Sequence, residues 1–73
     1  MRNLLHLNEG DIGYVTDLLA TGEMRRRLQD LGVITGTKIQ CTQKSPYGDP
    51  TAYAIRGAII ALRLEDAENI LVS

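Results

Sequence analysis

The chain has 73 residues and a formal net charge of −1, which fits one small domain and leaves no room for a second. Hydrophobic residues make up 44% and charged residues 23% of the chain, a globular rather than a disordered composition. The balance of 8 basic and 9 acidic residues, with three tyrosines as the only aromatic residues, argues against a nucleic-acid-binding surface.

The chain begins with a short apolar stretch that leads into a turn. Leu4, Leu5 and Leu7 supply apolar anchoring before the segment Asn8–Asp11, whose Gly10 can adopt a positive φ. A strand is predicted for residues 13–19, with Val15 facing inward and a break at Thr21–Gly22. No run approaches the roughly 20 apolar residues of a membrane span, and no signal peptide is recognisable. We therefore expect a cytoplasmic protein with no direct membrane insertion.

The next segment predicts a short amphipathic helix. Met24, Leu28 and Leu31 are spaced i, i+4 and i+7, which places them on one face. Glu23 suits the first turn of this helix. Gly32 stands where a left-handed residue would end the helix.

The second half of the chain is predicted to be mostly strands. We expect strands at residues 38–43, 51–55, 58–64 and 70–72, a hairpin at Arg56–Gly57 and one helical turn at 65–69. Ile39 and Cys41 are expected to face inward, and Ile60, Leu62 and Leu64 are expected to share one face of their strand. Five short strands with one helix after the first predict a mainly β protein, folded as a small, partly open barrel.

Three consecutive arginines lie in the middle of the predicted helix. Arg25, Arg26 and Arg27 could form a docking patch for an acidic partner, or they could form a solvated helix face. Successive helical residues diverge by about 100°, so only some of the three can point the same way. Arg25 and Arg26 are our candidates for partner contact.

The segment Ser45–Pro50 is a dense cluster of turn-forming residues. Its two prolines restrict the chain and would reduce the entropy lost on binding. Tyr47 would offer an apolar ring with a polar tip, although the loop could also be a rigid turn with Tyr47 folded over the barrel. The candidates for partner binding in this loop are Pro46, Tyr47, Asp49 and Pro50.

Metal chemistry has few side chains to use. The single cysteine excludes an internal disulfide, and one cysteine with one histidine cannot form a structural zinc finger. The weak candidates for a divalent transition metal are His6, Asp49 and Cys41, with Cys41 expected instead to be a small core residue. No cofactor is firmly implied.

Enzyme chemistry also has little support. The chain has no Ser/His/Asp order, no Cys–His pair close in sequence and no phosphate-binding glycine-rich loop ending in lysine. We therefore expect a protein that is not an enzyme.

Five sequence motifs, taken together and in order, closely resemble the family of ferrous iron transport protein A (FeoA). They are Leu7 with Gly10, Arg26–Gly32, Gly36–Ile39, Ser45–Pro50 and Ala61–Val72. The resemblance covers nearly the whole chain. Asn8 and Thr35 stand where many members carry proline, and Tyr47 stands where an aliphatic residue is more usual.

The resemblance implies a single FeoA-like domain over residues 1–73, folded as a five-stranded SH3-like barrel. It implies a cytosolic accessory protein that docks on FeoB, the membrane ferrous iron transporter, and modulates its activity. The alternative is a metal-binding regulatory domain, like the barrels of iron-dependent repressors, although the chain has no helix-turn-helix with which to read DNA. A homodimer through an open edge strand is a further alternative.

Overall fold

The structure, a computed structural model, describes residues 2–73, so the first residue of the expected 1–73 domain lies outside the described residues. The elements in chain order are β1 (Arg2–Asn3), the 3-10 helix η1 (Leu4–His6), β2 (Ile12–Leu18), α1 (Gly22–Asp30), β3 (Lys38–Lys44), β4 (Thr51–Ile55), β5 (Ala58–Leu62), α2 (Leu64–Ala67) and β6 (Ile70–Val72).

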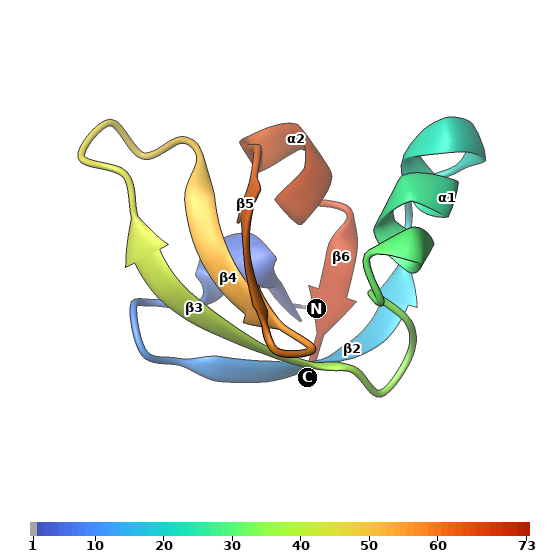
Figure 1. Cartoon of the computed structure of the whole chain (residues 1–73), viewed down its shortest axis with the longest axis horizontal. Helices are drawn as coiled ribbons and strands as arrows, with labels where there is room; N and C mark the ends of the chain where they lie inside the picture. The colour runs from blue at the N-terminus through green and yellow to red at the C-terminus, as the bar shows by residue number, and fades with distance from the viewer. Residues whose placement is uncertain (1) are drawn as a thin grey trace.

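The strands form one antiparallel sheet that curls into a small barrel (Figure 1). The strand order is β1-β6-β2-β3-β4-β5, so β1 and β5 are the edges of the sheet. The register shifts between Val15 and Asp17 on β2 and between Cys41 and Gln43 on β3. Such bulges bend a strand and increase its twist, which helps the sheet to curl.

The predicted mainly β class and barrel architecture are confirmed. Residues 51–55 and 70–72 form β4 and β6 at the expected bounds, and the Arg56–Gly57 hairpin joins β4 to β5. The structure adds a sixth strand, β1, whose residues Arg2 and Asn3 pair with Val72 and Leu71 of β6. A strand of two residues shows no hydrophobic alternation in the sequence. It forms because β6 has unpaired backbone groups with which Arg2 and Asn3 can pair.

The strand expected over residues 58–64 ends two residues early. β5 stops at Leu62, and Leu64 begins α2 with 47% of its surface exposed, so the prediction that Leu64 belongs to the strand is wrong. The cause is a long-range contact: the Leu64 N–H donates to Oδ1 of Asp49 at 2.9 Å. A carboxylate at the first turn favours helix over strand at this point.

The predicted helix is present as α1 and ends as expected. Leu28 is fully buried, while Met24 and Leu31 are half-buried and pack against the core. Gly32 has φ +95°, and its N–H donates to the Gln29 carbonyl while the Val33 N–H donates to the Leu28 carbonyl. This pair of bonds is a Schellman motif, which requires a left-handed residue just past the helix.

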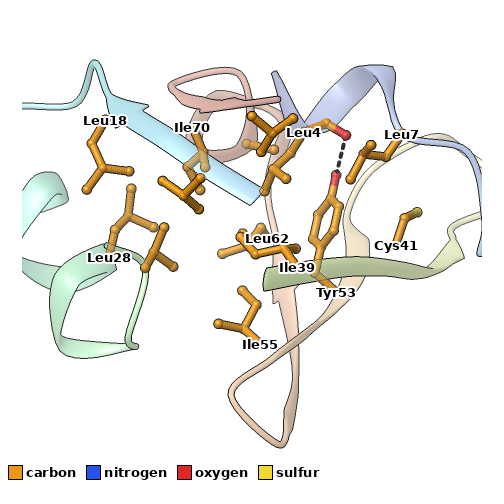
Figure 2. Packing of buried hydrophobic residues seen from close by; sticks show 14 of the residues in the cluster. Leu4, Leu7, Leu18, Leu28, Ile39, Cys41, Tyr53, Ile55, Leu62 and Ile70 are labelled. Atoms are coloured by element: carbon orange, nitrogen blue, oxygen red, sulfur yellow. Dashed lines mark hydrogen bonds between the residues drawn. The ribbon is translucent and has the colours of Figure 1, made fainter. Parts of the chain in front are cut away.

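The hydrophobic core fills the space between the curled sheet, η1 and α1, as Figure 2 shows. Tyr53 is 1% exposed, and its hydroxyl donates to the Leu4 carbonyl at 3.3 Å. Val15, Ile39 and Cys41 face inward as predicted. The core therefore positions the loops and helices that carry the exposed candidate residues.

Candidate docking surface

The loop between β3 and β4 carries the most exposed large hydrophobic side chain in the described chain. Tyr47 is 93% exposed, so it is not a lid on the barrel. The loop is held by its own hydrogen bonds: Gly48 N–H to the Ser45 carbonyl at 2.8 Å and Tyr47 N–H to Ser45 Oγ at 3.2 Å. The result is an ordered loop that projects an aromatic ring into solvent, a geometry typical of a contact residue.

Asp49 anchors this loop to the rest of the barrel. Its Oδ1 accepts from the Leu64 N–H at 2.9 Å, and its Oδ2 lies 3.9 Å from Nη1 of Arg63. Beside it is a cleft of about 230 Å³ lined by Leu5, Lys44, Gly48, Thr51, Tyr53 and Leu64. The position of Tyr47 is thus set by contacts that connect the loop to α2.

The three arginines of α1 have different surroundings. Arg25 is half-buried and donates from Nη1 to the Leu18 carbonyl at 2.9 Å, which ties α1 to the end of β2. Arg27 donates to Oδ1 of Asp66 at 2.8 Å. Arg26 is exposed and forms neither an ion pair nor a side-chain hydrogen bond within residues 2–73. Of the two candidates on the helix, Arg26 is the one whose guanidinium is free to meet a partner.

The loop and the helix do not form one patch. In Figure 1 the β3–β4 loop and α1 stand at opposite ends of the molecule, with α2 between them. A partner that touched both Tyr47 and Arg26 would have to span the barrel. Pro46, Tyr47, Asp49 and Pro50 lie together on one side, and Arg25 and Arg26 lie on the other.

The metal candidates are not brought together. Cys41 is fully buried in the core, and Nδ1 of His6 accepts from the Asn3 N–H at 3.0 Å. One oxygen of Asp49 is already engaged at the start of α2. Within residues 2–73, no three His, Cys, Asp or Glu side chains are grouped to hold a metal ion. These three residues do not fit a shared metal centre.

The two buried titratable groups of the core are both harder to ionise. Burial, with a smaller contribution from the neighbouring Cys41 thiolate, raises the pKa of Tyr53 to about 12, and a hydrogen bond with Thr51 acts in the opposite direction. Burial also raises the pKa of the Cys41 thiol, more than Lys44 lowers it. Cys41 is therefore a neutral core side chain rather than a reactive thiolate.

A second cleft, of about 430 Å³, is lined by none of the predicted site residues. Lys38 on β3 and Arg56 of the β4–β5 hairpin both line it. Sequence reasoning identified the hairpin but assigned it no role. One signal was available: arginine stands at a turn position where asparagine, aspartate or glycine is usual.

No helix within residues 2–73 is long and apolar enough to cross a membrane.

The curled antiparallel sheet, with a helix inserted between its first two long strands, defines a small β-barrel domain of the SH3-like class. A family model described as "FeoA domain" matches residues 2–73, and the chain belongs to this family.

Three relatives place the chain within the family. The FeoA protein of Chlorobium tepidum, solved by NMR in solution, is 37% identical with a TM-score of 0.90, over 97% of this chain and 68% of that one. The FeoA of Stenotrophomonas maltophilia, crystallised with zinc and described as an SH3 domain protein, is 25% identical with a TM-score of 0.88, over 100% of this chain and 91% of that one.

The third relative joins two proteins in one chain. It is an "Fe(2+) transport protein A/Fe(2+) transporter FeoB fusion protein" of Porphyromonas gingivalis, 33% identical over 69 residues. The match covers 94% of this chain but 8% of the fusion protein. The predicted FeoA resemblance is confirmed, and the names of the relatives link the family to ferrous iron transport.

Proposed function

We propose that this protein is a non-enzymatic accessory module of ferrous iron uptake that docks on the cytosolic side of a FeoB-type transporter and modulates its activity. The observation that carries the proposal is the fusion of a homologous FeoA segment to FeoB in one chain. Two domains fused in one organism are held at high effective concentration. As separate chains they would need a docking surface to achieve the same association.

The exposed side chains support a binding module. Tyr47 stands on an ordered loop and is 93% exposed, which suits an anchor that fills a pocket on a partner. Arg26 is exposed and has no ion-pair partner within residues 2–73, which suits a long-range attraction to acidic groups. Pro46, Asp49 and Pro50 fix the loop, while Arg25 fixes the start of the helix.

The polar side chains support a function without catalysis. The histidine and the cysteine are separated, since Cys41 is buried in the core and His6 is exposed at η1. Asp49 and Asp66 form ion pairs with arginines rather than with a nucleophile or base.

An NMR titration of the labelled protein with the cytosolic region of a FeoB-type transporter tests the proposal. We expect chemical-shift changes at Tyr47 and its loop. Tyr47→Ala should weaken binding by at least about 1 kcal/mol with little change in Tm, because the ring makes no core contact. Arg26→Glu should mainly slow association and reduce its salt dependence.

The controls separate docking from folding. Each variant is melted beside the wild type, and Leu28→Ala serves as a variant that loses core packing without changing the surface loop. Binding to no transporter segment, membrane-embedded parts included, would refute the proposal. Unchanged binding by Tyr47→Ala would show that the docking surface does not include the Tyr47 side chain.

A metal-binding regulatory role is the second candidate, because the Stenotrophomonas maltophilia relative was crystallised with zinc. His6, Asp49 and Cys41 are separated in this fold. A metal ion bound by any one of them would need further ligands from other side chains or from a second molecule. Titration with ferrous, manganous and zinc ions, followed at the resonances of the three residues, tests this role. Saturable shifts at micromolar metal would support it.

A further inference from the structure

The larger cleft opens beside β3, β4 and the hairpin that follows β4. Its volume is about 430 Å³, and it is lined by Gly36, Thr37, Lys38, Gln40, Ala54, Arg56 and Gly57. A Cβ built on Gly36 or Gly57 would meet nothing within 4 Å. The missing side chains at these two positions therefore help to keep the cleft open.

The lining of the cleft is basic. Its seven residues, all within the described chain, include two cations and no carboxylate. Neither Lys38 nor Arg56 takes part in an ion pair, and neither side chain forms a hydrogen bond elsewhere in residues 2–73. Two uncompensated cations on one concave surface attract an anionic group.

Arg56 occupies its position at a conformational cost. It is the residue other than glycine with a positive φ, +48°, within the described chain, and Gly57 follows with φ +84°. A two-residue hairpin of this type favours asparagine, aspartate or glycine at the first position. Strained positions of this kind concentrate at functional sites, and turn geometry does not account for arginine here, whose aliphatic stem also packs over Gly32.

Exposed apolar side chains continue the surface on both sides of the cleft. Gln40 and Ala54 of the lining are paired in register, and their outer neighbours are Ile12 on β2 and Ile59 on β5. Directly opposed residues share a face of a sheet, so these side chains form one row. Ile12 is 43% exposed, Ile59 is 66% exposed, and Tyr14, which pairs with Lys38, is 51% exposed.

We propose that this cleft binds an acidic segment of the partner protein. Its carboxylates would lie against Lys38 and Arg56, and its aliphatic side chains would lie on the row formed by Ile12 and Ile59. The inference rests on the proposed function, since it assumes a protein partner, and it adds a contact separate from the Tyr47 loop. Charge complementarity selects this occupant, because an apolar or basic segment would leave both cations unpaired.

A peptide titration tests the chemistry of the cleft without the transporter. The labelled protein is titrated with a short synthetic peptide of alternating glutamate and leucine, and with the matched peptide that carries glutamine for glutamate. We expect chemical-shift changes at Lys38, Gln40, Arg56 and Gly57 with the glutamate peptide and none with the glutamine peptide. Raising the salt concentration should weaken this binding because exposed charges are screened.

Three variants assign the effect to the cleft. Lys38→Gln and Arg56→Asn should each weaken peptide binding by up to about fivefold, the upper limit for exposed charge pairs. Arg56→Asn should melt at or above the wild-type temperature, because asparagine tolerates the left-handed turn. Lys44→Gln is the matched control: it removes the same charge from the same strand about 20 Å away and should bind the peptide like the wild type.

The outcomes separate this inference from the proposed function. Equal peptide affinity of the wild type and the Lys38→Gln/Arg56→Asn double variant would overturn it. So would cleft shifts produced by raising the protein concentration alone, since the occupant would then be a second copy. If the wild type and the double variant bind the transporter region equally well, docking stands and the cleft proposal fails. If the wild type does not bind the transporter but the acidic peptide shifts the cleft resonances, the proposed function fails, while the preference of the cleft for an acidic segment is supported.

Discussion

The guanidinium of Arg27 donates to Oδ1 of Asp66 at 2.8 Å, which connects α1 to α2 across 39 residues of sequence. The Asp66 side chain is 9% exposed and the Arg27 side chain 59% exposed. The nearly buried carboxylate therefore relies on a cation that reaches it from solvent.

Arg27→Met should destabilise the fold by about 1–2 kcal/mol, because it leaves the Asp66 carboxylate without its charged donor. Arg26→Met is the matched control, and it should stay within about 0.5 kcal/mol because Arg26 has no such contact. Urea denaturation measures both, and adding Asp66→Asn to Arg27→Met should recover part of the loss. Equal stability of the Arg27 and Arg26 variants would contradict the importance of this pair.

Leu28→Ala should cost about 2–5 kcal/mol, since Leu28 is fully buried in the core. Leu31→Ala should also destabilise, but less, because Leu31 is only half-buried. Leu64, which is 47% exposed, provides the control, and Leu64→Ala should change Tm little. Thermal melts that failed to rank the three variants in this order would show that α1 packs differently.

Gly32→Val should be more harmful than Gly48→Ala. Both glycines have a positive φ, +95° and +84°, so each substitution carries backbone strain of about 1–2 kcal/mol. A Cβ at Gly32 would also collide with Cδ of Arg56, whereas a Cβ at Gly48 would meet nothing within 4 Å. Gly32→Ala is the matched comparison with Gly48→Ala, and its excess loss of stability measures the Arg56 contact. Equal losses for the two alanine variants would show that the exposed Arg56 side chain moves aside at little cost.

Stability should fall in alkali between about pH 10 and pH 12 because of Tyr53. Its pKa in the folded protein is about 12, above the ordinary value of 10.0, so the unfolded chain releases the phenolic proton first. The stabilising contribution is complete below pH 10 and decreases as the pH rises toward 12, by up to about 2–3 kcal/mol. Denaturant titrations at several pH values measure this loss.

Tyr53→Phe tests the assignment of that alkaline transition. The variant removes the ionisable hydroxyl and its hydrogen bond to Leu4, so it should be less stable at neutral pH but have a flatter profile above pH 10. Tyrosinate absorbance, taken as the difference between wild type and variant, reports the Tyr53 titration directly. A difference spectrum with a midpoint near pH 10 would contradict the shift.

Local sequence patterns determined most of the fold. The i, i+4, i+7 spacing of Met24, Leu28 and Leu31, followed by Gly32, predicted α1 and its end, because periodicity and glycine's conformational freedom act over a few residues. Alternation around Ile39 and Cys41 predicted β3. The turn-forming loop was predicted, but its residues left open whether Tyr47 is exposed or folded over the barrel, and the structure shows Tyr47 93% exposed. Its role in binding stays a prediction.

Only the tertiary structure decided the features that depend on residues far apart in sequence. The Asp49 contact ends β5 and starts α2 at Leu64, the edge of β6 recruits β1, and the Asp66 contact commits Arg27 to the fold while Arg26 stays exposed. The basic cleft likewise needs Lys38 of β3 and Arg56 of the β4–β5 hairpin to line one concave surface. The sequence by itself determined β2 to β6 approximately and the helix α1, because those preferences are local. Tertiary folding decided which charged side chains are paired and which remain free for a partner, because it sets the distances between segments that are far apart in sequence.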